Sequence, residues 1–369
     1  MTQQQARPGL RVVVVGATGN IGSAVVEALG RDDRIGSVLG IARRPTSWRP
    51  AGTDWETADI GAHGSVPDLV DAFRGADVVI HTAWLIQPSR DTAVTWATNV
   101  LGTARVLRAV ALAEVPALLY ASSVAAYSPR RPGERPAPAD ENHPTHGWPT
   151  VAYSREKAYV ERLLDVFELR NPGTRVVRMR PGFVFRRAAA MEQRRLFAGP
   201  LVPHRLVRSA LVPAVPLVPG VVLQTVHARD VADGFLRAAL RQEARGAYNL
   251  AAEPPLTTAD FAALFDAPAP RVPYRAVRAA QALAYRARAV PSPPQLLDAL
   301  RRLPVMSTER ARSELGWRPT VGAADAVAEM LAGLRDAAGG PTAPLRERVP
   351  GGRAREVATG VGRRDDLPG

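Results

Sequence analysis

The sequence of 369 residues contains no cysteine and only one lysine. The absence of cysteine excludes disulfide bonds, thiolate metal sites and a cysteine nucleophile. No apolar run reaches the ~18 residues that a membrane-spanning helix needs, because three prolines interrupt the most apolar stretch, 211–226. The N-terminal segment also lacks the apolar core of a signal peptide. We therefore expect a cytoplasmic protein.

Basic residues outnumber acidic ones, 48 to 35, for a formal net charge of +13. An arginine-rich chain can bind nucleic acid or anionic lipid. However, no nucleic-acid-binding motif is present, and the arginines lack the regular aromatic interleaving of a stacking surface. Histidine and acidic residues likewise show no metal-ligand spacing. We therefore expect neither a nucleic-acid partner nor a metal site, and we attribute most of the charge to a composition biased toward arginine.

Apolar strand-like runs alternate with helical stretches over the first 180 residues. This alternation predicts βαβ units and a doubly wound parallel sheet, an α/β fold of the Rossmann type. We expect strands at 10–15, 38–42, 77–82, 117–122 and 174–180, and helices at 21–29, 92–113 and 153–169.

The pattern changes after Pro181, where arginine, proline and leucine become frequent. We predict a flexible N-terminus over 1–9, a dinucleotide-binding domain over 10–185, and a small, mainly helical C-terminal substrate lobe over 186–335. Residues 221–250 show strand and helix patterns again and are expected to return to the sheet. The glycine-, proline- and arginine-rich tail, 336–369, is expected to be disordered.

A glycine-rich turn, GATGNIG, joins the first predicted strand to the first helix. Glycines at such a turn let the backbone approach a pyrophosphate, whose charge the following helix N-terminus stabilises. We therefore predict that this turn binds a dinucleotide through Gly16, Thr18, Gly19, Asn20, Ile21 and Gly22.

Tyr153 and Lys157 lie four residues apart, on the same face of a predicted helix. An ammonium group close to a phenol lowers the phenol's pKa from about 10. The phenol can then exchange a proton with a substrate oxygen while hydride moves to or from a nicotinamide. Because Lys157 is the only lysine of the chain, and arginine presents a delocalised fork rather than a point charge, we predict that Tyr153 is the acid/base and Lys157 tunes its pKa.

These motifs resemble the extended short-chain dehydrogenase/reductase superfamily, which includes the NAD-dependent epimerase/dehydratase family. RMRPGFVF, VHARDVADG, GAYNLA and ARSELGWRP extend the resemblance over about residues 10–335. The resemblance implies that Ser123, or alternatively Ser122, binds the substrate oxygen and that Asn99 supports Lys157 through water. It also implies that Lys157 anchors the cofactor ribose and that the chain forms a homodimer through helices 92–113 and 153–169. Further cofactor contacts are implied for Asp59, Ile60, Thr82, Ala83, Tyr153 and Pro181.

The end of the second predicted strand bears on the choice of cofactor. An acidic residue there would bind the ribose 2′-hydroxyl of NAD, whereas arginine accommodates the 2′-phosphate of NADP. This sequence has no acid at that point and continues with Arg43 and Arg44. We therefore expect NADP as the cofactor, with NAD as the alternative.

The segment after Phe185 departs from sugar-nucleotide members of the superfamily, which usually carry Gly-Pro where this chain has Arg186-Arg187-Ala188. The residues that follow suggest an apolar substrate, although dispersed arginines can also grip a diphosphate. We predict hydride transfer at a carbonyl or secondary alcohol. A redox-neutral sugar-nucleotide epimerase or dehydratase with tightly bound NAD, and a non-catalytic NADP-sensing regulator, remain alternatives. The apolar residues are Leu196, Phe197, Leu201, Val202, Leu206 and Val207, and the arginines are Arg194, Arg195, Arg205 and Arg208.

Seven arginines and a single acid, Asp298, lie between residues 271 and 302, interleaved with apolar residues. A basic amphipathic helix can lie on an anionic membrane. More often such a helix packs its apolar face on its own domain. We therefore expect packing within the lobe and keep contact with a membrane surface as the alternative.

Overall fold

The computed structural model describes residues 9–87, 89–130, 138–201, 212, 214–348 and 351–359. The expectations for Val202, Arg205, Leu206, Val207 and Arg208 lie outside the described residues, as do those for 1–8 and 360–369. Within the described ranges, no helix is long and apolar enough to cross a membrane. Within the same ranges, no cluster of three or more acidic or histidine side chains is placed to hold a metal ion.

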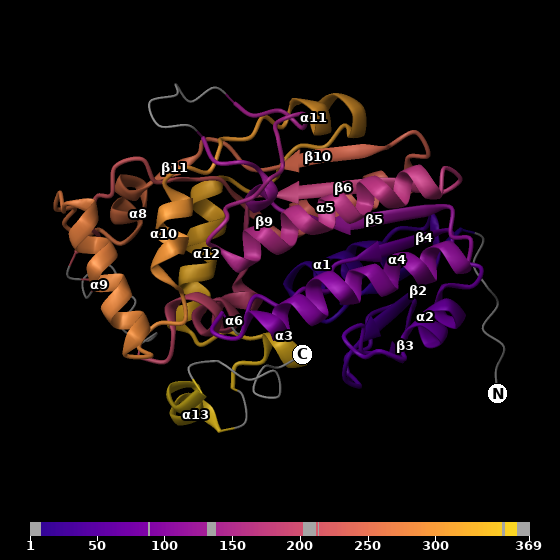
Figure 1. Cartoon of the computed structure of the whole chain (residues 1–369), viewed down its shortest axis with the longest axis horizontal. Helices are drawn as coiled ribbons and strands as arrows, with labels where there is room; N and C mark the ends of the chain where they lie inside the picture. Colours follow the sequence, from indigo (N-terminus) through magenta and orange to yellow (C-terminus); the bar gives the residue numbers. More distant parts are fainter. Residues whose placement is uncertain are drawn as a thin grey trace.

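A seven-stranded sheet forms the centre of the fold (Figure 1), with the strand order β10-β6-β5-β4-β1-β2-β3. Every neighbouring pair of strands is parallel. The order reverses between β1 and β4, which opens a crevice at the carboxyl ends of these strands. The predicted doubly wound α/β fold is confirmed. The strands are β1 (Leu10–Val15), β2 (Ile35–Ala42), β3 (Thr53–Thr57), β4 (Val78–His81), β5 (Ala117–Ala121), β6 (Arg175–Pro181) and β10 (Gly246–Leu250).

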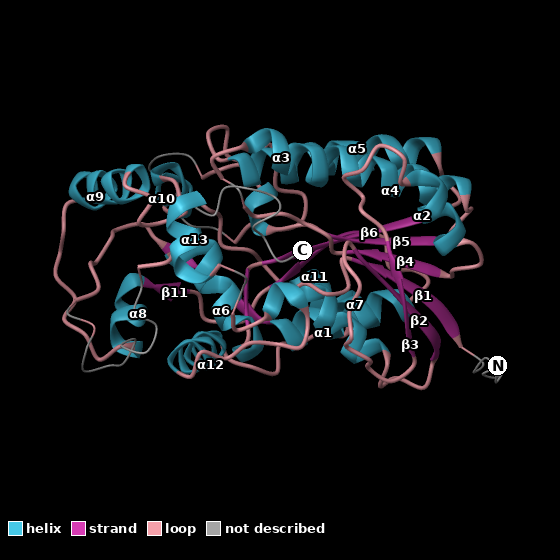
Figure 2. Cartoon of the chain, turned by 90° about the horizontal axis from the view of Figure 1, so that it is seen from below, coloured by secondary structure: helices cyan, strands magenta, loops and turns pink. Residues whose placement is uncertain are grey.

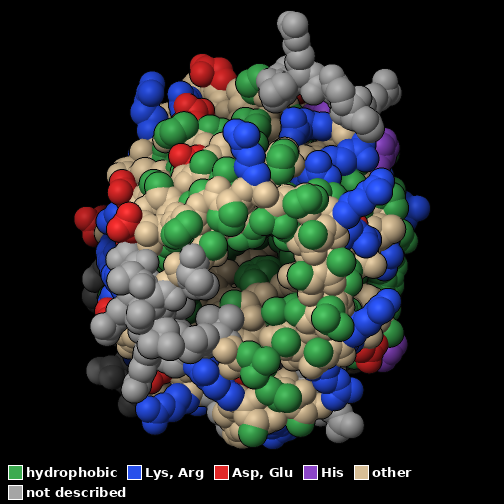
Figure 3. Space-filling view, turned by 90° about the vertical axis from the view of Figure 1, so that its left-hand side faces the viewer, with side chains coloured by type: hydrophobic (Ala, Val, Ile, Leu, Met, Phe, Trp, Pro, Cys, Tyr) green, Lys and Arg blue, Asp and Glu red, His purple; other side chains and the backbone are tan. Residues whose placement is uncertain are grey.

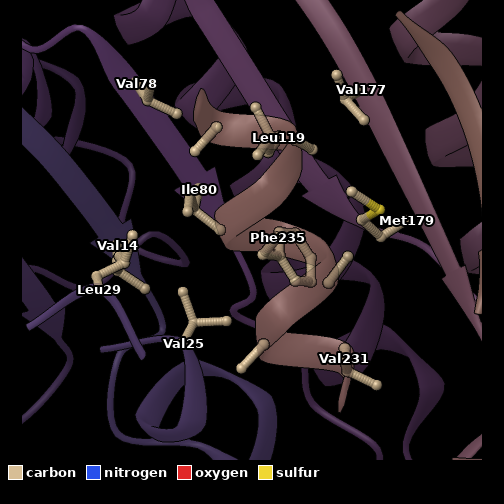
Figure 4. Packing of buried hydrophobic residues seen from close by; sticks show 14 of the residues in the cluster. Val14, Val25, Leu29, Val78, Ile80, Leu119, Val177, Met179, Val231 and Phe235 are labelled. Carbon is tan, nitrogen blue, oxygen red and sulfur yellow. The ribbon is translucent and has the colours of Figure 1, made fainter. Parts of the chain in front are cut away.

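Helices cover both faces of the sheet (Figure 2), which explains why its central strands are apolar at nearly every position. Val12 and Val14 of β1 pack on one side, while Val13 and Val15 pack on the other. Figure 4 shows the first of these cores, where Phe235 of α7 lies among side chains from α1 and the strands. One face carries α1 (Asn20–Leu29) and α7 (Ala228–Leu240), and the other carries α2 (Val66–Phe73), α4 (Gly102–Leu112) and α5 (Ala152–Arg170).

The helix expected over 92–113 is helical throughout, but its middle turn is not an α-turn. α3 (Thr92–Trp96) leads into a π-helical turn (Ala97–Leu101) that continues as α4. Asp91 begins the helix by accepting the backbone N–H of Ala93 on its side chain. The π-turn carries Asn99, and such turns are frequent at functional sites.

The C-terminal lobe packs at the carboxyl ends of the strands (Figure 1) and is mainly helical. It also contains two short strand pairs, β7 with β9 in parallel and β8 with β11 in antiparallel orientation. The strands are β7 (Phe183–Phe185), β8 (Val222–Leu223), β9 (Thr225–His227) and β11 (Leu256–Thr257), and the helices are α6 (Ala190–Gln193), α8 (Thr258–Leu264), α9 (Tyr274–Arg286), α10 (Pro294–Leu300), α11 (Glu309–Leu315) and α12 (Ala323–Arg335).

The tail differs from its prediction of disorder. Residues 336–348 and 351–359 have defined structure, which includes α13 (Gly352–Thr359). The hydroxyl of Thr342, a fully buried residue, donates to the backbone oxygen of Thr18 at 2.7 Å. The prediction of disorder is therefore wrong for these residues. The composition of the tail did not reveal its structure, because individual contacts with distant residues, such as the hydrogen bond of Thr342 and the burial of Leu345, hold it rather than a periodic apolar pattern.

Candidate active site

A cavity of about 1020 Å³ lies at the carboxyl ends of the parallel strands, where the sheet meets the C-terminal lobe. Nearly all of the residues predicted from the sequence line it. Arg44 and Asn99 are not among its lining residues. The predicted residues that line it are Gly16, Thr18, Gly19, Asn20, Ile21, Gly22, Arg43, Asp59, Ile60, Thr82, Ala83, Ser122, Ser123, Tyr153, Lys157 and Pro181.

The glycine-rich turn is packed so tightly that two of its glycines are required. Gly16 has a φ of +83°, and a Cβ atom there would collide with the backbone of Ala83. A Cβ at Gly22 would collide with the backbone oxygen of Gly16. Thr82 closes the turn from β4 by donating its hydroxyl to Val15 O at 3.0 Å and to Gly16 O at 3.2 Å. The N-terminus of α1 thereby borders the cavity, which is an arrangement that fits the pyrophosphate of a dinucleotide.

Residues that follow β2 and β3 also line the cavity. Arg43, directly after β2, lines the cavity, whereas the neighbouring Arg44 is exposed outside it. Asp59 and Ile60 also line the cavity, and Asp59 accepts the backbone N–H of Gly61 at 2.9 Å. Of the two arginines predicted to select NADP, the structure therefore brings only Arg43 to the site.

Ser122 and Ser123 have different partners. The Ser122 hydroxyl donates to Glu161 Oε1 at 2.6 Å, and Glu161 is fully buried beneath the site. Ser123 is hydrogen-bonded to Tyr153, a bond that acts to lower the pKa of Tyr153, and it accepts the backbone N–H of Ala125 at 3.1 Å. Ser123 therefore adjoins the phenol, and Ser122 belongs to the support below it.

Glu161 is held by arginines that the sequence analysis treated only as part of a strand motif. Arg180 donates to both of its carboxylate oxygens, at 2.9 and 3.0 Å, and Arg178 donates at 3.1 Å. These positive charges are among the causes that lower the pKa of Glu161 from its usual value despite its burial. The buried cluster ties α5, which carries Tyr153 and Lys157, to β6.

Lys157 is turned toward β5 rather than toward Tyr153. Its Nζ donates to Ala121 O at 2.6 Å and to the Tyr120 hydroxyl at 3.2 Å, and it lies 5.9 Å from the centroid of the Tyr153 ring. Burial lowers the pKa of Lys157 well below its usual value. Burial also raises the pKa of Tyr153, and the charge of Glu156 adds to that rise. The lowering of the phenol pKa that the four-residue spacing suggested is therefore absent from this geometry.

Sequence reasoning missed Trp84 and Glu156. The ring centroid of Trp84 lies 3.5 Å from Lys157 Nζ, and the same ring contacts Tyr153 edge-on at a centroid distance of 5.8 Å. Glu156 is only 2 % exposed and lines the cavity. The motif YSREK contains Glu156, but a carboxylate on a helix usually faces solvent, and no local signal marked this one as buried.

Asn99 positions Glu156 and the loop after β4. Its Nδ2 donates to Glu156 Oε2 at 2.6 Å and to Leu85 O at 2.8 Å, while its Oδ1 accepts the N–H of Leu85 at 2.7 Å. Thr95 donates to Glu156 Oε1 at 2.6 Å. Burial raises the pKa of Glu156, and these hydrogen bonds partly offset the rise. The resemblance implied that Asn99 is linked to Lys157 through water. In the structure its side-chain amide instead donates directly to the carboxylate of Glu156.

The part of the cavity wall that the C-terminal lobe contributes is mainly apolar. Two of the arginines that were considered as diphosphate ligands line this region, but the chain itself engages both. Arg194 forms a two-point ion pair with Glu356 at 2.7 and 2.9 Å, and Arg195 donates to the backbone oxygens of Pro344 and Arg346. The apolar lining comprises Leu85, Ile86, Val124, Leu196, Phe197, Val277, Leu296, Leu297, Leu300 and Leu303.

Glu192 is a further acidic residue of the cavity wall that the sequence did not indicate. Burial raises its pKa to about 7, with Arg195 and Arg186 opposing the rise. Below the site, His81 Nε2 is hydrogen-bonded to Thr103 Oγ1 at 2.9 Å. Burial, together with the charge of Lys157, lowers the pKa of His81 to about 3, so its imidazole is neutral at neutral pH.

Comparison with known proteins identifies similar sequences and folds. Residues 12–251 match the NAD dependent epimerase/dehydratase family. The 4-hydroxy-2-methyl-3-oxo-4-farnesyl-3,4-dihydroquinoline-1-oxide ketoreductase of Stigmatella aurantiaca is 27% identical over 324 residues, which cover 84% of this chain and 92% of that protein. The L-arabinose 1-dehydrogenase (NAD(P)(+)) of Haloferax volcanii is 30% identical over 113 residues, 31% of this chain and 41% of the relative. The UDP-glucose 4-epimerase of Thermus thermophilus, solved with NAD, has the same fold with a TM-score of 0.64 and 24% identity over 88% of this chain and 99% of that one.

Proposed function

Because the chain belongs to the NAD dependent epimerase/dehydratase family, whose members are enzymes that bind NAD(P), we propose that it is an NADP-dependent oxidoreductase that reduces an apolar ketone. One observation carries the proposal: the apolar side chains of the lobe line the same cavity as the hydrogen-bonded pair of Ser123 and Tyr153. The relative from Stigmatella aurantiaca, which this chain matches over 92% of its length, is a ketoreductase of a farnesyl-bearing compound. That activity is consistent with an apolar ketone as the substrate class.

The proposed reaction assigns a separate task to each polar group. The nicotinamide, when bound, supplies hydride to the carbonyl carbon. Tyr153 donates its phenolic proton to the carbonyl oxygen, and Ser123 donates a hydrogen bond to the same oxygen. Because burial raises the pKa of Tyr153, the phenol stays protonated at neutral pH and suits the acid role of the reductive direction. Lys157 holds the cofactor ribose. Asn99 and Glu156, which are hydrogen-bonded to each other, support the cavity wall.

We assign the remaining predicted residues to binding of the cofactor. The glycine-rich turn and the N-terminus of α1 hold the pyrophosphate, and Asp59 and Ile60 border the adenine end. Thr82, Ala83 and Pro181 line the path between the two ends. Arg43 binds the 2′-phosphate, which only NADP carries. The exposed Arg44 adds at most a weak electrostatic contribution.

Replacing Tyr153 with phenylalanine tests this function. We expect Tyr153→Phe to lose at least ~100-fold in turnover, because general acid catalysis contributes about that much or more, while its affinity for NADPH stays within about twofold of the parent. Turnover would be followed as loss of NADPH absorbance with a panel of apolar ketones, and affinity by fluorescence titration with NADPH and NADH.

Three outcomes of these experiments would contradict parts of the proposal. Undiminished turnover of Tyr153→Phe would remove Tyr153 from the reaction. NAD(H) that stays bound through purification, with no net redox change on any ketone, would favour the sugar-nucleotide epimerase alternative. Stronger binding of NADH than of NADPH would contradict the assignment of Arg43.

We also propose that the enzyme is a homodimer. Five large apolar side chains are exposed along the adjacent helical stretches 97–112 and 152–170. A two-fold axis along these helices would bury both copies of this surface. The residues are Leu101, Leu112, Tyr159, Val166 and Leu169.

A further inference from the structure

Exposed large apolar side chains gather at a second place, away from the surface just described. In the described part of the chain the remaining four are Phe197, Leu201, Leu283 and Val357. They come from segments that are distant in sequence: the stretch that follows α6, helix α9 and helix α13. We call the surface that these four residues form the mouth.

Printed contacts join the segments of the mouth to one another. Ser292 donates its hydroxyl to Phe197 O at 2.9 Å, which ties the loop after α9 to the stretch after α6. Arg288 donates to Ala358 O at 2.6 Å, which ties the end of α9 to α13. Residues from each of these segments also line the cavity. Figure 3 shows this face of the molecule with a hollow, and hydrophobic side chains lie along much of its rim.

Helix α9 is apolar on two opposite faces. Val277 and Tyr285 line the cavity on one side, whereas Leu283 on the other side is 69% exposed. No residue of the helix is buried. A helix that is apolar on both faces normally has both covered. Exposed alanines lie on the same outer face as Leu283 and form one apolar stripe with it. The residues of the stripe are Ala276, Ala279, Ala280, Leu283 and Ala287.

The charges around the mouth are almost all positive. Arg275, Arg286 and Arg288 are exposed on α9 and at its end, and Figure 3 shows basic side chains placed around the hollow. The stretch 271–302 has one acidic residue and the described part of 351–359 has one. Both are engaged by arginine: Asp298 by Arg278 at 2.9 Å and Glu356 by Arg194 at 2.7 Å. Among the described residues, this surface therefore combines exposed apolar groups with an excess of positive charge.

We propose that the mouth docks on an anionic lipid surface, with the outer face of α9 at the interface, and that the substrate enters the cavity from the bilayer. Arginine side chains can keep their charge among lipid headgroups while apolar groups between them enter the interface. The identification of the entering molecule rests on the proposed function, because an apolar ketone would partition into a bilayer. The docking itself requires no substrate.

Co-sedimentation with vesicles tests the docking. The full-length protein would be mixed with vesicles of phosphatidylcholine alone, or of phosphatidylcholine with phosphatidylglycerol, at low and high salt. We expect binding to the anionic vesicles that weakens as salt rises, because screening reduces the attraction between arginine and headgroup. Leu283→Glu and Arg286→Glu should each weaken it on the order of tenfold. Arg318→Glu, which makes the same charge change at an exposed position outside the mouth, should bind like the parent.

The outcomes separate the docking from the reaction. Failure to bind anionic vesicles, equal binding to both vesicle types, or undiminished binding of Leu283→Glu would overturn the proposal. Light scattering without lipid supplies a further check, because an assembly that Leu283→Glu dissolves would mean that a second copy covers the mouth, which also overturns it. Binding that behaves as expected, with no ketone reduced by NADPH, would uphold the docking surface and reject the proposed reaction. Far-UV circular dichroism of each variant would verify that it is folded.

Discussion

Two adjacent serines illustrate how closely spaced residues can serve different ends. Ser122 donates to the buried carboxylate of Glu161, and Ser123 adjoins the phenol of Tyr153. Sequence reasoning preferred Ser123 for the substrate and kept Ser122 as the alternative. The geometry favours the same choice for a physical reason: the Ser122 hydroxyl is already committed to an anion.

Replacing each serine with alanine should separate these tasks. Ser123→Ala should lower kcat on the order of 100-fold through loss of a hydrogen bond to the reacting oxygen. Ser122→Ala should retain most of its kcat but lose about 1–3 kcal/mol of stability, because Glu161 loses a buried donor. Steady-state kinetics and urea unfolding of both variants provide the measurement. The reverse pattern, with kcat lost in Ser122→Ala alone, would exchange the two assignments.

Glu156 should influence the pH dependence of the reaction. Its negative charge raises the pKa of Tyr153, so Glu156→Gln should lower that pKa. In the reductive direction Tyr153 must be protonated, and activity is lost as pH rises through its pKa. The alkaline limb of the kcat/KM profile should therefore move to lower pH in Glu156→Gln.

A matched control is available on the same helix. Glu168 is also a glutamate of α5, but it pairs with Arg178 at the far end and is partly exposed. Glu168→Gln should leave the alkaline limb where it is in the parent. An unchanged limb in Glu156→Gln would show that Glu156 has only a structural role.

At the scale of elements, the C-terminal tail acts as part of the cavity wall. Pro344, Gly352 and Glu356 line the cavity, and Thr342 contacts the glycine-rich turn. The ion pair between Arg194 and Glu356 holds the tail. It is buried, with the two side chains only 3% and 8% exposed. A buried ion pair that loses one partner leaves the other charge uncompensated.

Glu356→Ala should therefore detach the tail, at a local cost of about 3–5 kcal/mol. We expect faster proteolysis within 336–359 and faster release of NADPH, because the segment that contacts the glycine-rich turn, the proposed pyrophosphate site, loosens. Limited proteolysis and stopped-flow displacement of NADPH measure the two effects. Glu347→Ala is the matched control, since Glu347 belongs to the same segment but forms an exposed pair with Arg348 at the surface. Equal behaviour of the two variants would contradict a role for the buried pair.

At the scale of the whole molecule, the two exposed apolar surfaces should have separate partners. Val166→Glu with Leu169→Glu places like charges on the face of α5 proposed for the dimer, and a two-fold axis would duplicate them across the interface. We expect this variant to be a monomer by light scattering, while Leu283→Glu keeps the parent mass. A parent protein that is itself a monomer at all concentrations tested would refute the dimer.

Local patterns were sufficient to predict the central framework. The run of apolar residues from Leu10 to Val15 is strand β1 with the expected bounds, because a strand covered on both faces must be apolar throughout. The glycine-rich turn and the Tyr153–Lys157 spacing also lie within single short segments. β3 (Thr53–Thr57) and α2 were not predicted; β3 is an edge strand, and its five residues are exposed or half-buried, so it lacks an apolar signature.

The sequence by itself thus determined the parallel sheet, the glycine-rich turn and many, though not all, of the residues that border the cavity, since each depends on neighbours along the chain. Tertiary structure alone decided the burial of Glu156, the orientation of Lys157 and the place of the tail. Thr342 and Thr18 are 324 positions apart, and Arg194 and Glu356 are 162 apart. No periodicity or spacing encodes such contacts, because they form only when the folded sheet and lobe bring distant segments together.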